Sequence, residues 1–267
     1  MISLLRKQTA RQASILLVTA SITAKLLGFV RASVTARAFG IAPDYDLFLV
    51  VFALPTIVNA TLSYTIPNAV TPFYQKLRVD LGESRARVYA WWFGITLLVL
   101  FVTLALGIGV VATPIVSLLA PISTPAEKVL ATQLLQILAW WLPLSFGTIA
   151  VQTFLRAEGY YLACAAGPVL LDLAIVTFIL LGSSWGVLSL AWGWVGGAGV
   201  HFLWLFSAYL WSRPRSETRG RVTPSVAASW ICRMLIASFQ VAAIEIWAQL
   251  FVAIDRLIAQ YSEMPTG

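Results

Sequence analysis

The chain has 267 residues, of which 60% are hydrophobic and only 11% carry a charged side chain. A soluble globular protein has about 25% charged residues, so this composition excludes a soluble domain. The net charge of +7 could indicate nucleic-acid binding, but no basic stretch with interleaved aromatic residues lies outside the apolar runs. We therefore expect an all-α, polytopic transmembrane helical bundle with membrane lipids, and no nucleic acid, as partners.

Apolar runs long enough to cross a bilayer follow one another along the chain. They predict about seven transmembrane spans of roughly 20 residues or more, at residues 13–38, 46–70, 89–112, 130–155, 162–182, 187–211 and 231–259. Basic residues precede the first span, as they also precede a signal peptide. The run continues past Lys25 and Arg31 to Phe39 without a clear cleavage site, so we expect a first transmembrane helix.

The basic residues are distributed unevenly between the two sides of the predicted bundle. With the N-terminus inside, the loops on its side carry Arg6, Lys7, Arg11, Lys76, Arg78, Arg85, Arg87, Arg156, Arg213, Arg215, Arg219 and Arg221. The loops on the other side carry Arg37 and Lys128. Because positive residues are retained in the cytoplasm, we expect a multi-pass protein of the bacterial inner membrane with a cytoplasmic N-terminus.

Two kinds of residue near the predicted span ends give further expectations. Cys164 and Cys232 fall at cytoplasmic helix ends and should be reduced thiols, without a disulfide. Tryptophans such as Trp140 and Trp141 lie near span ends and should anchor the chain at the headgroup level.

The first span combines small residues with two cations. Small side chains recur every four positions, at Ala20, Ala24, Gly28, Ala32, Ala36 and Gly40, a spacing that favours close approach of another helix. Lys25 and Arg31 lie about 60° to either side of Gly28, so both should point toward the bundle. A charge within the membrane costs about 3 kcal/mol or more, so each cation needs an anionic partner or a wet cavity. The alternative is snorkelling to the interface.

The second span is rich in proline and polar residues. Asp44 is a candidate N-cap, Asp46 follows it, and Pro55 falls within the helix, where proline removes a hydrogen bond and bends the chain. Polar side chains then cluster at Thr56, Asn59, Thr61, Ser63, Tyr64, Thr65 and Asn68. Discontinuous helices of this kind often line transporter sites. The alternative is a kinked helix that serves packing alone.

Isolated polar residues mark the later spans. Asp172 is either hydrogen-bonded to a neighbouring helix or a ligand for an ion or proton. The single histidine, His201, is interpreted as a packing or interfacial residue in preference to a proton carrier. In the seventh span Glu245, Gln249, Arg256 and Gln260 share one face, which should point inward.

The sequence shows no pattern that indicates catalysis. It has no Cys/His cluster for a metal, no nucleophile–base set and no P-loop. We therefore expect a protein that is not an enzyme, with no catalytic residues, no metal site and no cofactor.

Several motifs resemble the MurJ/MviN family of lipid flippases. Residues 25–31 (KLLGFVR) and 36–40 (ARAFG), then Asp46, then 52–55 (FALP) look like the first two helices of that family. Residues 167–172 (GPVLLD) and 254–256 (IDR) are similar to later family elements. The resemblance implies alternating access by two lobes around a cationic cavity. Its implied cargo is lipid II, the undecaprenyl-pyrophosphate precursor of peptidoglycan.

The resemblance also implies a site and a domain organisation. Matching positions give cavity roles to Lys25, Arg31 and Asp46, and we add the polar residues Asn59, Glu245 and Arg256 as substrate-binding candidates, with Gly28 and Pro55 as hinge or packing positions. The chain corresponds to about half of the family's architecture. We expect a six-helix lobe at 1–221 and the first helix of a second lobe at 222–267, with a second lobe or second subunit required for transport.

Two departures from the family pattern keep alternatives open. Asn59 and Ala60 stand where the family has basic residues, and Thr56 replaces its asparagine. Another polyprenyl-linked glycan is therefore an alternative cargo. A cation-coupled drug exporter of the same superfamily is a second alternative, although it would need a cavity centred on carboxylates. A non-transporting, half-size scaffold for envelope assembly is the third.

Overall fold

The fold of the chain, taken from a computed structural model, is described for residues 10–119, 124–212, 229–244 and 247. Its helices are α1 (Ala10–Phe39), α2 (Pro43–Leu81), α3 (Glu83–Val110), α4 (Ala112–Leu119), α5 (Pro125–Ala139), α6 (Trp141–Ala157), α7 (Tyr161–Leu181) and α8 (Val187–Trp211). A 3-10 turn, η2 (Ser183–Trp185), precedes α8, and a further helix spans Ser229–Ile244. The described residues contain no strand, which confirms the all-α class.

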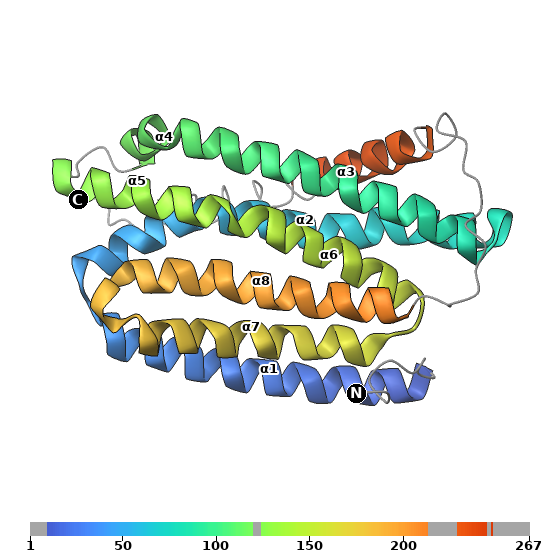
Figure 1. The fold of residues 1–267 in the computed structure, drawn as a ribbon, viewed down its shortest axis with the longest axis horizontal. Helices are drawn as coiled ribbons and strands as arrows, with labels where there is room; N and C mark the ends of the chain where they lie inside the picture. The colour runs from blue at the N-terminus through green and yellow to red at the C-terminus, as the bar shows by residue number, and fades with distance from the viewer. Residues whose placement is uncertain (1–9, 120–123, 213–228, 245–246, 248–267) are drawn as a thin grey trace, which may run out of the picture.

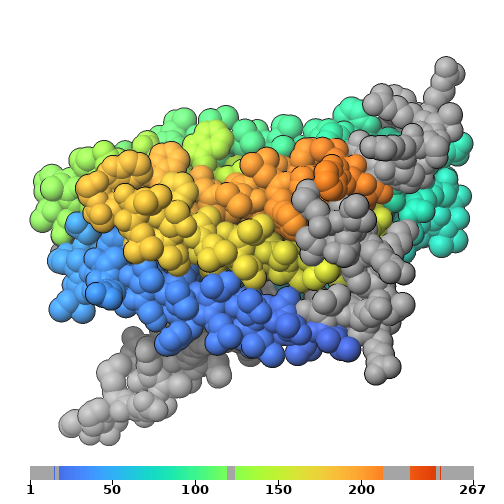
Figure 2. All heavy atoms as spheres, turned by 60° about the horizontal axis from the view of Figure 1, so that its bottom comes forward, coloured from blue at the N-terminus to red at the C-terminus, as the bar shows by residue number. Residues whose placement is uncertain are grey.

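The long helices run roughly parallel to one another as a single bundle (Figure 1). Helix α7 packs against α1 on one side and α8 on the other, and α6 packs against α8, α2 and α3. Helix α1 therefore lies at an edge of the bundle, beside α7 along its length (Figures 1 and 2). This arrangement leaves much of α1 without a helical partner among the described residues.

Helix lengths and composition agree with a polytopic membrane protein. Five segments are long and apolar enough to cross a bilayer: α2, α3, α5 with α6, α7 and α8. Helix α1 has 30 residues, which is also long enough, but it carries Lys25 and Arg31 within it. The Ser229–Ile244 helix falls in the predicted seventh span. The rest of that span lies outside the described residues.

Helix α2 is continuous at Pro55, which favours the kinked helix over the discontinuous one, and the bundle is interrupted elsewhere. Helix α2 runs through Pro55, and the Thr56 hydroxyl donates to the Phe52 carbonyl oxygen at 2.7 Å, within the turn that proline weakens. The fourth predicted span is instead divided at Trp140, between α5 and α6. Pro143 follows in the first turn of α6, and it has no N–H to continue the α5 hydrogen-bond ladder.

Helix boundaries correct two further expectations. The N-cap of α2 is Ala42, not Asp44, because Pro43 with its fixed φ occupies the first helical position. Helix α2 extends to Leu81 and α3 begins at Glu83, so the predicted loop between the second and third spans is almost entirely helical. Only Gly82, with φ of +85°, separates the two helices, and glycine adopts that backbone conformation without strain.

The closest helix approach lies between α7 and α8, not along the small-residue stripe of α1. A Cβ atom added at Gly197 would lie 2.9 Å from the Leu171 carbonyl oxygen. One added at Gly28 would lie 3.8 Å from Asp172 Oδ2, an ordinary contact. A strict four-residue spacing rotates about 40° around the helix at each step. The α1 stripe is therefore half-buried at Ala20, Ala24 and Gly28 and exposed at Ala32, Ala36 and Gly40.

Candidate functional site

Arg31 points into the bundle and has two partners there. Its Nη1 lies 3.2 Å from Asp172 Oδ1 on α7, and its guanidinium carbon lies 4.7 Å from the centre of the Trp194 ring on α8. The Arg31 side chain keeps 26% of its surface exposed, whereas Asp172 keeps 10%. The pair matches the first alternative for Asp172, contact with a neighbouring helix.

Lys25 and Asp46 lie outside this arrangement. Lys25 is exposed and makes no ion pair with any residue that the structure describes. Asp46 is exposed in the first turn of α2, where a carboxylate favours the helix dipole. Lys25 and Arg31 therefore differ: Asp172 and Trp194 hold Arg31, whereas Lys25 is exposed and has no ion pair within the described residues.

A cavity of about 250 Å³ lies beside Trp194 in the middle of the bundle. Helices α2, α6, α7 and α8 contribute its lining residues: Asn59, Ser63, Trp141, Ser145, Thr148, Ile149, Gln152, Pro168, Leu171, Trp194, Ala198 and His201. None of them is an aspartate, glutamate, lysine or arginine. The cavity therefore offers neutral hydrogen-bonding groups and aromatic rings, and Arg31 and Asp172 are not among its lining residues.

The polar groups of the cavity are only partly satisfied. Ser145 on α6 donates a short hydrogen bond to the Asn59 side-chain oxygen on α2. The Gln152 amide donates to the Cys164 carbonyl oxygen at 3.4 Å, near the limit of a hydrogen bond. His201 is buried, and its Nε2 has no hydrogen-bond partner in the part of the chain that the structure describes. Nε2 instead packs against Gly167, where an added Cβ would lie 2.0 Å from it.

Aromatic rings form one wall of the cavity. The Phe52 ring lies 4.7 Å from the Trp194 ring and 5.3 Å from the Trp141 ring, measured between centroids. Trp141 is 5% exposed, so its predicted role as an interfacial anchor is wrong, whereas its neighbour Trp140 is 45% exposed. The reason is local: Trp141 begins α6 and faces α8, and Trp140, at the break between helices, points outward.

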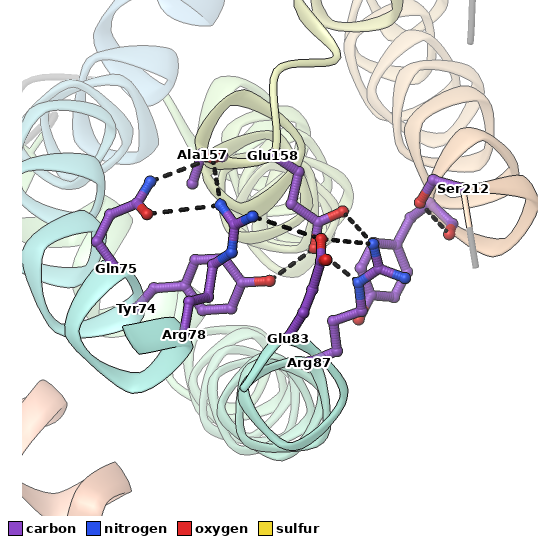
Figure 3. A network of polar contacts seen from close by, with 9 residues as sticks. Tyr74, Gln75, Arg78, Glu83, Arg87, Ala157, Glu158 and Ser212 are labelled. Atoms are coloured by element: carbon purple, nitrogen blue, oxygen red, sulfur yellow. Dashed lines mark hydrogen bonds and ion pairs between the residues drawn. The ribbon is translucent and has the colours of Figure 1, made fainter. Parts of the chain in front are cut away.

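A second polar region, the Glu158 network, joins α2, α3 and the end of α6 (Figure 3). Glu158 is fully buried and accepts two hydrogen bonds from Arg87 at 3.0 Å and one from the Tyr74 hydroxyl at 2.6 Å. Glu83 binds Arg87 at 3.3 Å and Arg78 at 3.4 Å. The network therefore pairs each cation that it contains with a carboxylate.

Further bonds complete this end of the bundle. Arg78 and Gln75 both donate to the Ala157 carbonyl oxygen, at 3.0 and 3.1 Å. Burial, followed by the nearby charge of Glu158, raises the pKa of the Tyr160 hydroxyl in the loop between α6 and α7. The sequence predicts Arg78 and Arg87 as loop cations and does not predict the network. Its members lie up to 84 positions apart in the sequence, so no short sequence motif predicts the network.

The structure brings some of the predicted site residues together. Asn59 lines the cavity, Arg31 stacks on the ring that forms its wall, and Gly28 lies beside the Asp172 carboxylate. Pro55 is buried one turn before Asn59. Glu245 and Arg256, with the rest of the polar stripe of the seventh span, lie outside the described residues.

Two expectations about cysteine and metal chemistry can be compared with the described residues. Cys164 is buried, Cys232 is exposed, and both are free thiols in the structure. Within the described ranges, no group of three or more His, Cys, Asp or Glu side chains lies together.

Comparisons with known proteins agree on one family. The family model described as "Lipid II flippase MurJ" matches residues 35–264. A curated relative, "Probable lipid II flippase MurJ" from Buchnera aphidicola, is 26% identical over 191 residues, which are 69% of this chain and 37% of the relative.

Solved structures show the same fold. The lipid II flippase MurJ in its inward closed conformation superimposes with a TM-score of 0.63 and 14% identity, over 85% of this chain and 47% of that one. A structure titled "protein A" superimposes with a TM-score of 0.56 and 15% identity, over 97% of this chain and 57% of that one. The chain thus spans about half the length of the solved structures that it matches, and 37% of the curated relative.

Proposed function

The chain belongs to the family of the lipid II flippase MurJ, and we propose that it forms the first lobe of a flippase for a polyprenyl-pyrophosphate-linked saccharide. The cargo favoured by the family is lipid II, moved from the cytoplasmic to the outer leaflet of the inner membrane. The observation that carries the proposal is the family match over residues 35–264. The proposed activity is transport without covalent catalysis.

The cations of α1 support this proposal. A pyrophosphate carries negative charge that must be offset where water is scarce, and cations in a low-dielectric site do so strongly. Lys25 is exposed and lacks an ion pair within the described residues, and Arg31 is held in place by Asp172 and Trp194. We therefore assign Lys25 to direct contact with the pyrophosphate, and Arg31 to a contact whose geometry is set by its two partners.

The open face of α1 supports a second lobe. Only α7 covers α1 extensively among the described helices, so none of the described helices forms a wall opposite Lys25. A cavity that opens to each leaflet in turn needs a second body that moves against the first. We therefore propose that the 267-residue chain alone does not flip substrate. Flipping by a proven monomer of this chain in liposomes would contradict this.

Complementation tests the proposed function directly. The natural gene product that carries this sequence is expressed in a bacterium depleted of its own lipid II flippase, and lipid II exposed on the outer leaflet is measured. We expect growth and outer-leaflet lipid II to be restored. Membrane-inserted protein that restores neither would contradict lipid II as the cargo.

Another lipid-linked glycan is the second candidate cargo. Asn59 stands where the family pattern has a cation, and in the structure it faces a neutral cavity beside Ser145. A site with fewer cations suits a headgroup with fewer anionic groups. Flipping of undecaprenyl-pyrophosphate lipids with different sugars, by the same natural gene product in liposomes, would rank the two cargoes. Lipid II transported more slowly than a neutral glycan would favour the second.

The orientation follows from the basic residues of the loops. We propose that the N-terminus and residues 213–221 face the cytoplasm, because basic residues are concentrated on that side. Single cysteines introduced by Ser183→Cys and Ser216→Cys, in a background without Cys164 and Cys232, test this with an impermeant thiol reagent on intact cells. Position 183 should be labelled and position 216 protected. The reverse pattern would invert the topology.

A further inference from the structure

The cavity beside Trp194 has the chemistry of a carbohydrate site. Its volume of about 250 Å³ is near the lower end of the roughly 300–1,000 Å³ found for small-molecule sites. This is room for one sugar ring, not for a complete glycan headgroup. Because all its lining residues are neutral, it suits a hydroxyl-rich, uncharged ring better than a pyrophosphate or a metal ion.

The hydrogen-bonding groups come from three helices and converge on this space. Asn59 and Ser63 lie on α2, Gln152 on α6 and His201 on α8. His201 is 8% exposed, and its Nε2 is unpartnered among the described residues. Side-chain amides, which donate and accept, match hydroxyl groups in either direction.

Two tryptophans give the cavity an apolar wall. The Trp141 and Trp194 rings meet edge to face with centroids 5.4 Å apart, and both line the space. A sugar ring has one face of C–H groups, which packs against an aromatic face while its hydroxyls bond the polar side. The cavity thus presents both an apolar wall and hydrogen-bonding groups, which are the two features that a sugar ring requires.

Arg31 of α1 lies close to this wall. Its guanidinium carbon is 4.7 Å from the centre of the Trp194 ring, and Trp194 also lines the neutral cavity. In a lipid-linked saccharide the first sugar is bonded to the pyrophosphate. Charge at Arg31 and Lys25 and neutral hydrogen bonding in the cavity therefore match the order of groups in the substrate.

We propose that this cavity, formed by α2, α6, α7 and α8, binds the first sugar of the lipid-linked substrate, while the α1 cations bind its pyrophosphate. The inference rests on the proposed function, because it assigns a part of that substrate. It predicts that affinity for glycosylated lipid and affinity for bare lipid can be changed separately.

Binding of three lipids to the purified natural gene product, followed by tryptophan fluorescence in detergent, tests the inference. The probes are undecaprenyl pyrophosphate, the same lipid bearing one hexose, and lipid II. Wild-type protein should bind at least one glycosylated lipid about tenfold more tightly than the bare lipid, as one or two extra hydrogen bonds would give. The cavity variants are Gln152→Leu and Ser145→Ala, each of which removes a polar group and keeps a similar or smaller volume.

The cavity variants should lower affinity for the glycosylated lipid by about three- to tenfold and leave affinity for bare lipid unchanged. Lys25→Gln is the matched control, and it should lower the affinity for both lipids to the same extent. Equal binding of glycosylated and bare lipid by wild-type protein would overturn the sugar subsite and leave the proposed function intact. Cavity variants that lower the affinity for both lipids equally would also overturn it. So would variants that change the Na⁺ dependence of binding and leave the affinity for the glycosylated lipid unchanged. Failure of wild-type protein to bind any lipid would contradict the proposed function itself.

Discussion

The Glu158 network and the α1 cations place arginine inside the same bundle in different ways. In the network, the buried Glu158 carboxylate binds Arg87 through two bonds and also accepts from Tyr74. On α1, Arg31 has one carboxylate partner at 3.2 Å and one aromatic ring and remains 26% exposed, and Lys25 has no ion pair with a described residue. The network ties three helices together through buried, paired charges, and only Arg87 Nη1 among its guanidinium donors is buried without a partner in the described residues. An exposed cation without an ion pair can instead bind a ligand.

The difference predicts opposite responses to mutation. Removing a network member should reduce stability, because it leaves a buried charge uncompensated. Removing an α1 cation should reduce transport and change stability little. Four substitutions test this, ordered by their expected effect on stability.

Glu158→Ala should have the largest effect. It leaves the Arg87 guanidinium, whose side chain is only 8% exposed, without its two strongest bonds. Breaking a buried pair in this way costs about 3–5 kcal/mol. The thermal unfolding midpoint of the purified protein should fall steeply. Glu83→Gln is the matched control, since Glu83 is 38% exposed and its ion pairs should contribute at most about 1 kcal/mol. Equal losses for the two variants would mean that burial does not distinguish them.

Tyr74→Phe should have the next largest effect. It keeps the buried ring and removes only the hydroxyl that donates to Glu158 at 2.6 Å. A hydrogen bond to a charged group contributes about 1.5–3 kcal/mol. Thermal unfolding with and without Glu158→Ala gives the coupling between the two residues. The double variant should lose less than the sum of the single losses. Additive losses would show that the bond contributes little to the network.

Asp172→Ala should have a smaller effect on stability. It removes the carboxylate partner of Arg31, but the guanidinium is 26% exposed and keeps its contact with Trp194. The cost should be about 1–2 kcal/mol, between the values for exposed and buried pairs. Arg31→Ala and the double variant complete a thermal-unfolding cycle for the pair. A loss of stability as large as that of Glu158→Ala would mean that this pair stabilises the fold as strongly as the buried network does.

The sequence was sufficient for the class and for most helices, because unbroken apolar runs of bilayer length have few other solutions. Helices α7 and α8 agree with the predicted spans to within one residue. The helix ends around residues 71–88 were missed, because polar helical turns that extend past an apolar run carry no hydropathy signal. The break at Trp140 was missed because it depends on Pro143 in the following turn, whereas the similar Pro55 leaves α2 continuous.

Site residues could be predicted only where a single charged residue lies within an apolar stretch of sequence. Arg31 and Asp172 each stand alone among apolar residues, which indicates function or pairing, but their pairing joins α1 to α7 and needs the fold. The cavity is lined by ordinary polar residues such as Ser145 and Gln152, neither of which is unusual in a helix. They become part of a site only because four helices meet around the same space. The Glu158 network is likewise formed by residues from three helices.

Lys25 should combine the smallest effect on stability with a large effect on function. Its side chain is exposed and has no ion pair within the described residues, so Lys25→Ala removes no contact that holds the bundle together. Surface changes of this kind usually alter stability by less than about 0.5 kcal/mol. The same change removes a charge from the proposed pyrophosphate site, where the cation has no second partner to replace it. The variant should insert, fold with a wild-type unfolding midpoint and fail to complement a flippase-depleted strain. Lys25→Arg, which keeps the charge, is the control and should retain activity. If Lys25→Ala complements fully, the cation has no role in transport, and the distinction between buried, paired charges and exposed, unpaired ones no longer identifies the substrate site.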